Sequence, residues 1–78
     1  MEKRGISTRM RNLMQKYIGK TYAFNYHGRI IWTSTIIGLM GNTGYFLTEI
    51  NDGQDKWNSN ASYGEITHGI KKGQYIEQ

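Results

Sequence analysis

The two histidines are the side chains best suited to general acid–base chemistry near neutral pH. His27 and His68 each stand beside a glycine in a turn-like context, and neither has a clear acidic or serine partner nearby. They are too far apart in the chain to predict a zinc site. The chain has no cysteine, which excludes thiolate ligands, disulfides and a cysteine nucleophile. We therefore expect a protein that is not an enzyme and uses neither a metal nor a cofactor.

Two other short stretches contain residue types that occur in ligand sites. Glu49, Asp52 and Asp55 are close in sequence, but their spacing is not that of the oxygen ligands in a calcium loop. Residues 51–53, NDG, are typical of a turn. Residues 19–21, GKT, lack the upstream glycine of a phosphate-binding loop. Neither stretch predicts catalysis.

Basic side chains are concentrated in the first part of the chain. Through residue 29 there are seven basic residues and one acidic residue, which gives a net charge of +6. The remaining residues have a net charge of −2, because five carboxylates outnumber three lysines. Such an asymmetry can attract RNA, DNA or an acidic protein surface. The candidate phosphate contacts are Arg9, Arg11, Lys16, Lys20 and Arg29.

Aromatic residues alternate along the run KTYAFNY, so Tyr22, Phe24 and Tyr26 share one face of a predicted strand. Tyr22 or Tyr26 could stack on bases while nearby cations neutralise phosphates. The other interpretation is a core-facing strand, and it fits Phe24 best. The run partly resembles the aromatic RNA-binding strand of RRM and cold-shock proteins. However, Thr21 and Asn25 replace a glycine and an aliphatic residue of that pattern, and the strand comes first in the order. We do not assign the RRM fold.

A helix must position the first group of cations. Apolar residues recur at helical spacing over residues 7–18, with basic and polar residues on the opposite side. Ser7 or Thr8 can serve as the N-cap, and Gly19 can end the helix. We therefore predict an amphipathic helix with a basic outer face.

After the helix, the apolar spacing changes to the period of two that strands require. Turns at residues 27–28 and 41–44 separate the runs, and Gly38 predicts a bend in the long second one. Residues 51–62 are polar apart from Trp57 and predict a loop. The predicted strands cover residues 20–26, 29–40, 45–50, 63–68 and, for a short last strand, 75–76.

One helix and four or five short antiparallel strands predict a single α+β, mainly β, domain over residues 1–78. We expect residues 20–78 to curl into a small barrel on which the helix packs. The run TSTIIGLMGNTGYFLTE gives a strand, a bending glycine, a turn and another apolar strand. At fold level this order resembles SH3-like and Sm-like small barrels. The turn at residues 41–44 lacks the acidic residue usual in Sm-like proteins, so the RNA-binding function of that family is not carried over.

Two functions from different classes remain. The first is a small nucleic-acid-binding or regulatory protein that uses the basic helix face and the tyrosines named above. The second is a protein-binding inhibitor or adaptor, of the kind that phages and mobile elements encode, with Trp57 and Tyr63 as anchors. Trp57 could instead cover the core. Unpaired strand edges could also join two copies into a homo-oligomer.

The sequence also bears on location. No apolar run approaches the roughly 20 residues of a membrane span, and the first residues lack the apolar region of a signal peptide. A small secreted domain without cysteine would lack its usual disulfides. We therefore expect a cytoplasmic protein with no membrane partner.

Overall fold

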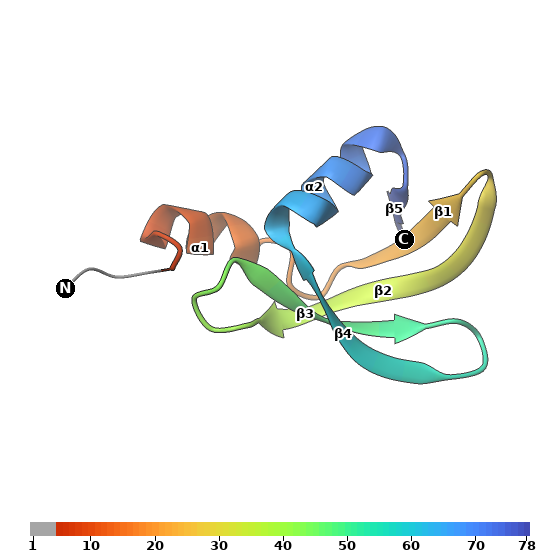
Figure 1. Ribbon diagram of the computed structural model, residues 1–78, viewed down its shortest axis with the longest axis horizontal. Coiled ribbons are helices and arrows are strands. Elements are labelled where there is room, and N and C mark those ends of the chain that lie inside the picture. Colours follow the sequence, from red (N-terminus) through yellow and green to blue (C-terminus); the bar gives the residue numbers. More distant parts are fainter. Residues whose placement is uncertain (1–4) are drawn as a thin grey trace.

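The computed structural model describes residues 5–78, which form an α+β domain dominated by one antiparallel sheet (Figure 1). Five strands and two helices alternate with short turns. In chain order the elements are α1 (Thr8–Gln15), β1 (Thr21–Tyr26), β2 (Arg29–Leu39), β3 (Tyr45–Asn51), β4 (Lys56–Ser62), α2 (Tyr63–Lys72) and β5 (Tyr75–Glu77).

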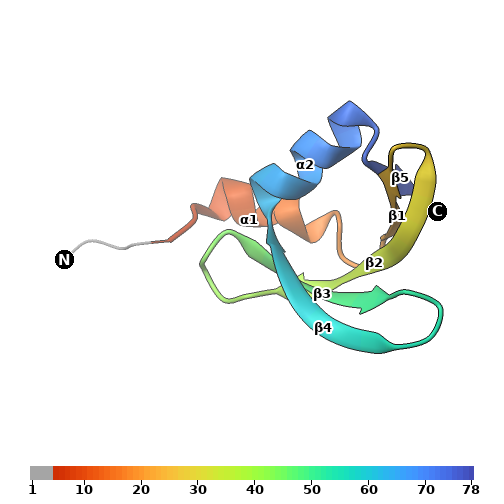
Figure 2. The same ribbon diagram turned by 45° about the vertical axis from the view of Figure 1, so that its right-hand side comes forward.

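The five strands follow the order β4-β3-β2-β1-β5, and every neighbouring pair is antiparallel. The sheet is not closed: β4 and β5 form its two edges. The small barrel predicted from the sequence is therefore not confirmed. The sheet instead curves into an open half-shell whose concave side faces α2 (Figure 2).

Local chemistry explains the turn and the bend in the first two strands. His27 and Gly28 both have positive φ, 52° and 85°, as a two-residue hairpin turn of the favoured hand requires. The pairing of β2 with β3 shifts between Ile36 and Gly38, which confirms the predicted irregularity at this glycine. Both predictions are confirmed. Such features can be predicted from sequence because each depends on a few adjacent residues.

Helix α1 is shorter than predicted. The Ser7 hydroxyl accepts a hydrogen bond from the Met10 N–H, which confirms the N-terminal cap. The helix ends at Gln15 rather than at residue 18, and a turn follows it. The Gly19 N–H then donates to the Ile36 carbonyl at 2.7 Å, which ties the chain to the sheet.

The prediction of a strand over residues 63–68 is wrong, because this segment is the first part of α2. The Ser62 hydroxyl accepts from the Glu65 N–H, so the run Ser-Tyr-Gly-Glu starts the helix as in a capping box. Gly73, with φ of 81°, ends it in the left-handed conformation. The loop predicted over residues 51–62 is wrong for its second part, since β4 runs from Lys56 to Ser62.

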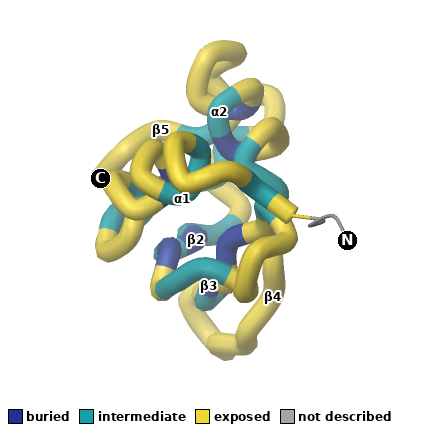
Figure 3. The backbone as a smooth tube through the Cα atoms, turned by 90° about the vertical axis from the view of Figure 1, so that its left-hand side faces the viewer, coloured by how far each residue is buried: buried dark blue, intermediate teal, exposed yellow. Residues whose placement is uncertain are grey.

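The core lies between the helices and the centre of the sheet. Phe46 packs against Tyr17 and Tyr63, with ring centroids 5.7 and 6.2 Å apart. Figure 3 shows buried segments on the central strands and on α2, whereas β4 is exposed over most of its length. The buried core side chains are Met14, Tyr22, Ile36, Phe46, Ala61 and Ile66.

The buried Tyr22 predicts a loss of stability in alkali. Its side chain is 2% exposed, and burial, with smaller effects of Glu77 and Tyr17, raises its pKa to about 12. A tyrosine in the unfolded chain titrates near pH 10. The contribution of Tyr22 is therefore complete below about pH 10 and is lost as the pH rises through its folded pKa. Urea unfolding between pH 9 and 12 should show a shallower decline for Tyr22→Phe than for the wild type. Identical declines would contradict this.

Candidate functional site

Five aromatic side chains share the concave side of the sheet, where Tyr75 packs against Gly69 of α2. Phe24 of β1 lies directly opposite Trp32 of β2 and Tyr75 of β5, and directly opposed residues point to the same side of a sheet. Trp57 of β4 lies opposite Ile50 of β3, which in turn pairs with Ser34, two residues after Trp32. We call this set the aromatic face: Phe24, Tyr26, Trp32, Trp57 and Tyr75.

Four of the five rings of the aromatic face pack together around Phe24, and Trp57 stands apart from them on β4. Phe24 stacks on Trp32 with ring centroids 4.9 Å apart and an interplanar angle of 15°. Phe24 also lies 6.4 Å from Tyr26 and 5.6 Å from Tyr75. Stacked rings restrain one another's rotamers. The row is therefore an ordered surface that crosses β1, β2 and β5.

Much of this aromatic surface is open to solvent. Tyr26 is 56% exposed and Trp57 is 44% exposed. Both hairpins of the sheet, β1–β2 and β3–β4, extend beyond α2 (Figure 1). The helices thus cover one end of the concave side and leave the hairpin end uncovered.

A groove of about 240 Å³ lies between the aromatic face and the start of α2. Trp32, Trp57 and Tyr75 contribute its aromatic walls. Glu65 is the charged residue of its lining, which also includes Ser34, Thr48, Ile50, Ser59, Asn60 and Ala61. The groove therefore offers both π surfaces and one carboxylate to a ligand.

A second hollow, of about 330 Å³, lies at the end of the sheet. It is lined by Ile30 and Ile31 on one side and by the 51–53 turn on the other. Asp52 accepts hydrogen bonds from the Gln54 and Asp55 N–H groups, which hold the pKa of its carboxyl below the usual value. The prediction that residues 51–53 form a turn is confirmed.

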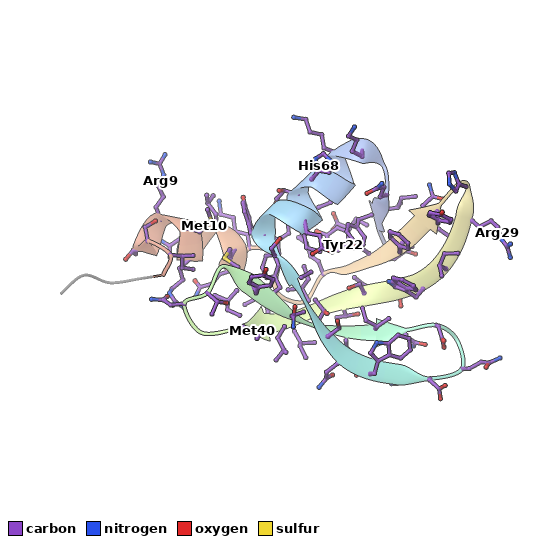
Figure 4. The ribbon with its side chains drawn as sticks, in the orientation of Figure 1. Arg9, Met10, Tyr22, Arg29, Met40 and His68 are labelled. Atoms are coloured by element: carbon purple, nitrogen blue, oxygen red, sulfur yellow. The ribbon has the colours of Figure 1, made fainter. Side chains whose placement is uncertain are left out.

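The five predicted phosphate contacts do not gather at one place. Arg9 lies at the α1 end of the molecule and Arg29 at the opposite end (Figure 4). The Arg11 guanidinium donates to the Asn42 side chain, and the Lys20 ammonium forms a 3.0 Å ion pair with Glu77. Lys16 is exposed at the C-terminal cap of α1. The structure therefore groups the cations of α1 and separates Arg29 from them.

The predicted aromatic contacts divide between core and surface. Tyr22 points into the core beneath α2 (Figure 4), so it cannot stack on a base, whereas Tyr26 is exposed. Tyr63, the predicted protein anchor, is half-buried against Tyr17 and Phe46. Trp57, the other predicted anchor, is exposed on an edge strand.

Sequence reasoning missed two members of the site, Trp32 and Tyr75. Alternation along β2 places Trp32 on the same side as Ser34 and Ile36, so its strand face could be predicted. The partial exposure of the Trp32 side chain could not be predicted, because it depends on which part of the sheet α2 covers. The aromatic face thus becomes visible only in three dimensions.

Neither of the two histidines lines the groove beside the aromatic face. His68 lies on the outer side of α2 (Figure 4), and His27 packs edge-on against Tyr26 at 4.2 Å. Within residues 5–78 there is no group of three or more His, Cys, Asp or Glu side chains that could hold a metal ion. In the same residues, no helix has the length and apolar character that a membrane crossing needs.

The chain was compared with known proteins by sequence and by structure. No family model, curated protein or solved structure matches it. On the surface of the chain, the aromatic face is the most extended group of packed aromatic side chains.

Proposed function

We propose that this protein is a small protein-binding module, an adaptor or inhibitor, which docks a segment of a larger protein on its aromatic face. The supporting observation is the exposure of Tyr26 and Trp57 on the aromatic face, whose other three side chains are half-buried. Exposed apolar patches on small domains mark interaction sites, and Trp and Tyr are the residues that most often anchor them.

The residues around the aromatic face favour a protein partner over nucleic acid. Ile30 is 55% exposed and Ile31 38% exposed in the second hollow, at the end of the sheet, and exposed aliphatic side chains suit an apolar protein surface. Among the described residues, those lining the two hollows include carboxylates but no cation. Arg29 lies directly opposite Tyr26 at the tip of the β1–β2 hairpin, but a backbone of phosphates would need cations along the hollows as well.

We infer further that the open sheet is a variant of the SH3-like architecture suggested by the sequence. The connection through α2 returns the chain to β5, which pairs with β1 at the opposite edge from β4. This inference rests on fold-level analogy and carries no argument for the function.

Selection from a display library of random linear peptides tests the proposed function. Three immobilised proteins are compared: the wild type, Trp57→Ala and Tyr45→Ala. Tyr45 is a matched control, because it is 43% exposed on the same sheet but points to the convex side. We expect peptides with a shared motif to be enriched on the wild type and on Tyr45→Ala. Their affinity for Trp57→Ala should be at least about tenfold lower, as for the loss of an interface anchor.

Two results would contradict the proposal. The first is a set of peptides that binds Trp57→Ala as well as it binds the wild type. The second is enrichment that depends on Tyr45 instead. Thermal unfolding of each variant checks that the fold is retained, which we expect because Trp57 is exposed on an edge strand.

Nucleic-acid binding is the second candidate function, and α1 is the observation that favours it. Arg9 and Arg11 lie on this helix, which has no acidic residue, and Lys16 caps it. If α1 contacts phosphates, the affinity for a mixed-sequence oligonucleotide should fall as the salt concentration rises, and the Arg9→Ala, Lys16→Ala variant should reduce that salt dependence. Affinity that stays flat with salt would end this candidate.

A further inference from the structure

The groove beside β4 contains a buried hydroxyl group without a partner. The Thr48 side chain is 1% exposed, and its Oγ1 atom has no hydrogen-bond partner. Leaving a buried hydroxyl without a hydrogen bond is unfavourable. A ligand that donates a hydrogen bond to this oxygen would satisfy the hydroxyl, so the groove favours a polar ligand group.

A carboxylate lies at the rim of the same groove. Glu65 is in the first turn of α2, and no cation forms an ion pair with it among the described residues. Both Glu65 and Tyr75 line the groove, and burial followed by the Glu65 charge raises the pKa of the Tyr75 hydroxyl. Glu65 and Thr48 therefore favour a ligand group that is positively charged and donates hydrogen bonds.

The aromatic walls suit the same kind of group. Trp57 and Tyr75 line the groove, and the π face of tryptophan attracts cations most strongly among the aromatic side chains. A planar guanidinium can stack on such a ring and donate two parallel hydrogen bonds to a carboxylate. The arginine side chain thus matches the groove better than the lysine side chain.

The free edge of the sheet gives the partner's backbone a place to bind. β4 is an edge strand, and it carries no charged side chain after Lys56. Natural edge strands that must stay unpaired usually carry charges, bulges or prolines, which residues 57–62 lack. An extended segment can therefore add to β4 as a sixth strand.

The register of β4 connects this edge to the groove. Ser59 lies directly opposite Thr48, and it is the small residue between Trp57 and Ala61 on the concave side. Strands in a sheet are about 4.8 Å apart. A long side chain opposite Ser59 on an added strand can therefore cross Ser59 and reach the Thr48 hydroxyl.

We propose that an extended segment of a partner protein pairs with β4 and places an arginine side chain in the groove, between Trp57 and Glu65, with a hydrogen bond to Thr48. This inference rests on the proposed protein-binding function and names its partner: an extended segment with an arginine flanked by uncharged β-forming residues. The aromatic face beyond the groove remains available for apolar residues of the same partner.

A synthetic peptide tests the inference with a charge-neutral control. The probe is acetyl-Thr-Val-Thr-Arg-Thr-Val-Thr-amide, and the control has citrulline in place of arginine, which keeps the shape and removes the charge. Dissociation constants come from amide and indole chemical shifts of the ¹⁵N-labelled protein. We expect the arginine peptide to bind at least about tenfold more tightly than the control. Shifts should include the amides of β4.

Single substitutions test the contributions of Glu65 and Thr48 to arginine binding separately. Glu65→Gln should reduce the preference for arginine over citrulline to near unity, whereas Glu49→Gln, a matched change on the convex side of β3, should retain it. Thr48→Val should lower the affinity for the arginine peptide. The free protein should be as stable as the wild type or more stable, since an unsatisfied hydroxyl is removed.

The inference would be overturned by equal binding of both peptides, by an unchanged preference in Glu65→Gln, or by no shifts in β4. Such results together with Trp57-dependent display peptides would leave the proposed function standing. A loss of Trp57 dependence in the display experiment would overturn the function itself. Shifts produced only by an oligonucleotide would overturn both.

Discussion

Replacement of Phe46 by alanine is expected to lower the free energy of unfolding by about 3–5 kcal/mol. Phe46 is fully buried and packs against Tyr17 and Tyr63, so truncation leaves a cavity that these rings cannot easily fill. A domain of 78 residues has a total stability of only about 4–12 kcal/mol. Urea unfolding followed by circular dichroism should therefore show a variant that has lost about a quarter or more of its stability.

Leu47→Ala is the matched control for Phe46→Ala. Leu47 is the next residue of β3 but points to the convex side, where it is 36% exposed. Its truncation should cost about 1 kcal/mol or less, because most surface changes have small effects. Similar losses in the two variants would contradict the assignment of the core to the concave side.

Gly69→Ala is expected to destabilise the protein by about 1–3 kcal/mol, as overpacking does. Gly69 is buried in α2, and a Cβ atom there would lie 2.7 Å from Cε2 of Tyr75 and still closer to its Cδ2. Tyr75 cannot move away freely, because it packs against Tyr22 and Phe24. This cost should exceed the gain of about 1 kcal/mol that alanine normally brings to a helix.

Gly64→Ala provides the opposite expectation within the same helix. A Cβ atom at Gly64 would meet nothing within 4 Å, so this change should be neutral or stabilising by up to about 1 kcal/mol. Thermal unfolding of the two variants compares them directly. Stabilisation by Gly69→Ala would show that α2 does not pack on Tyr75 as described, and the shape of the groove would then be in doubt.

Local sequence patterns predicted the first half of the fold. The Ser7 cap, the turn at residues 27–28 and the bend near Gly38 are each set by one or two adjacent residues. The strands over residues 20–26 and 45–50 follow from alternating apolar residues. Features of this kind depend little on distant contacts, which is why they could be predicted.

The second half was predicted poorly because its patterns are weak. β4 is rich in asparagine and serine, which disfavour strands or favour turns, and pairing with β3 overrides that preference. The start of α2 did carry a local signal: Ser62 and Glu65 have the spacing of a capping box. That signal directly precedes Ile66. Residues 63–68 were nevertheless predicted to be a strand, because the apolar segment is short.

The candidate site depends on distances that no sequence pattern contains. The net charge of the first 29 residues was correct as a count, yet Arg9 and Arg29 stand at opposite ends of the molecule. Trp57 became a site residue because β4 is an edge strand, and Tyr75 because β5 returns to β1. Both facts belong to the topology of the whole sheet.

The two tryptophan side chains allow the most direct measurement of the central claim, that the aromatic face binds a protein segment. Both Trp32 and Trp57 line the groove, so their indole N–H resonances report on its occupation. On addition of the tightest display-selected peptide, both resonances should shift and saturate together with the amides of β4. Shifts confined to the convex side, at Tyr45, Ile37 and Leu47, would contradict the account.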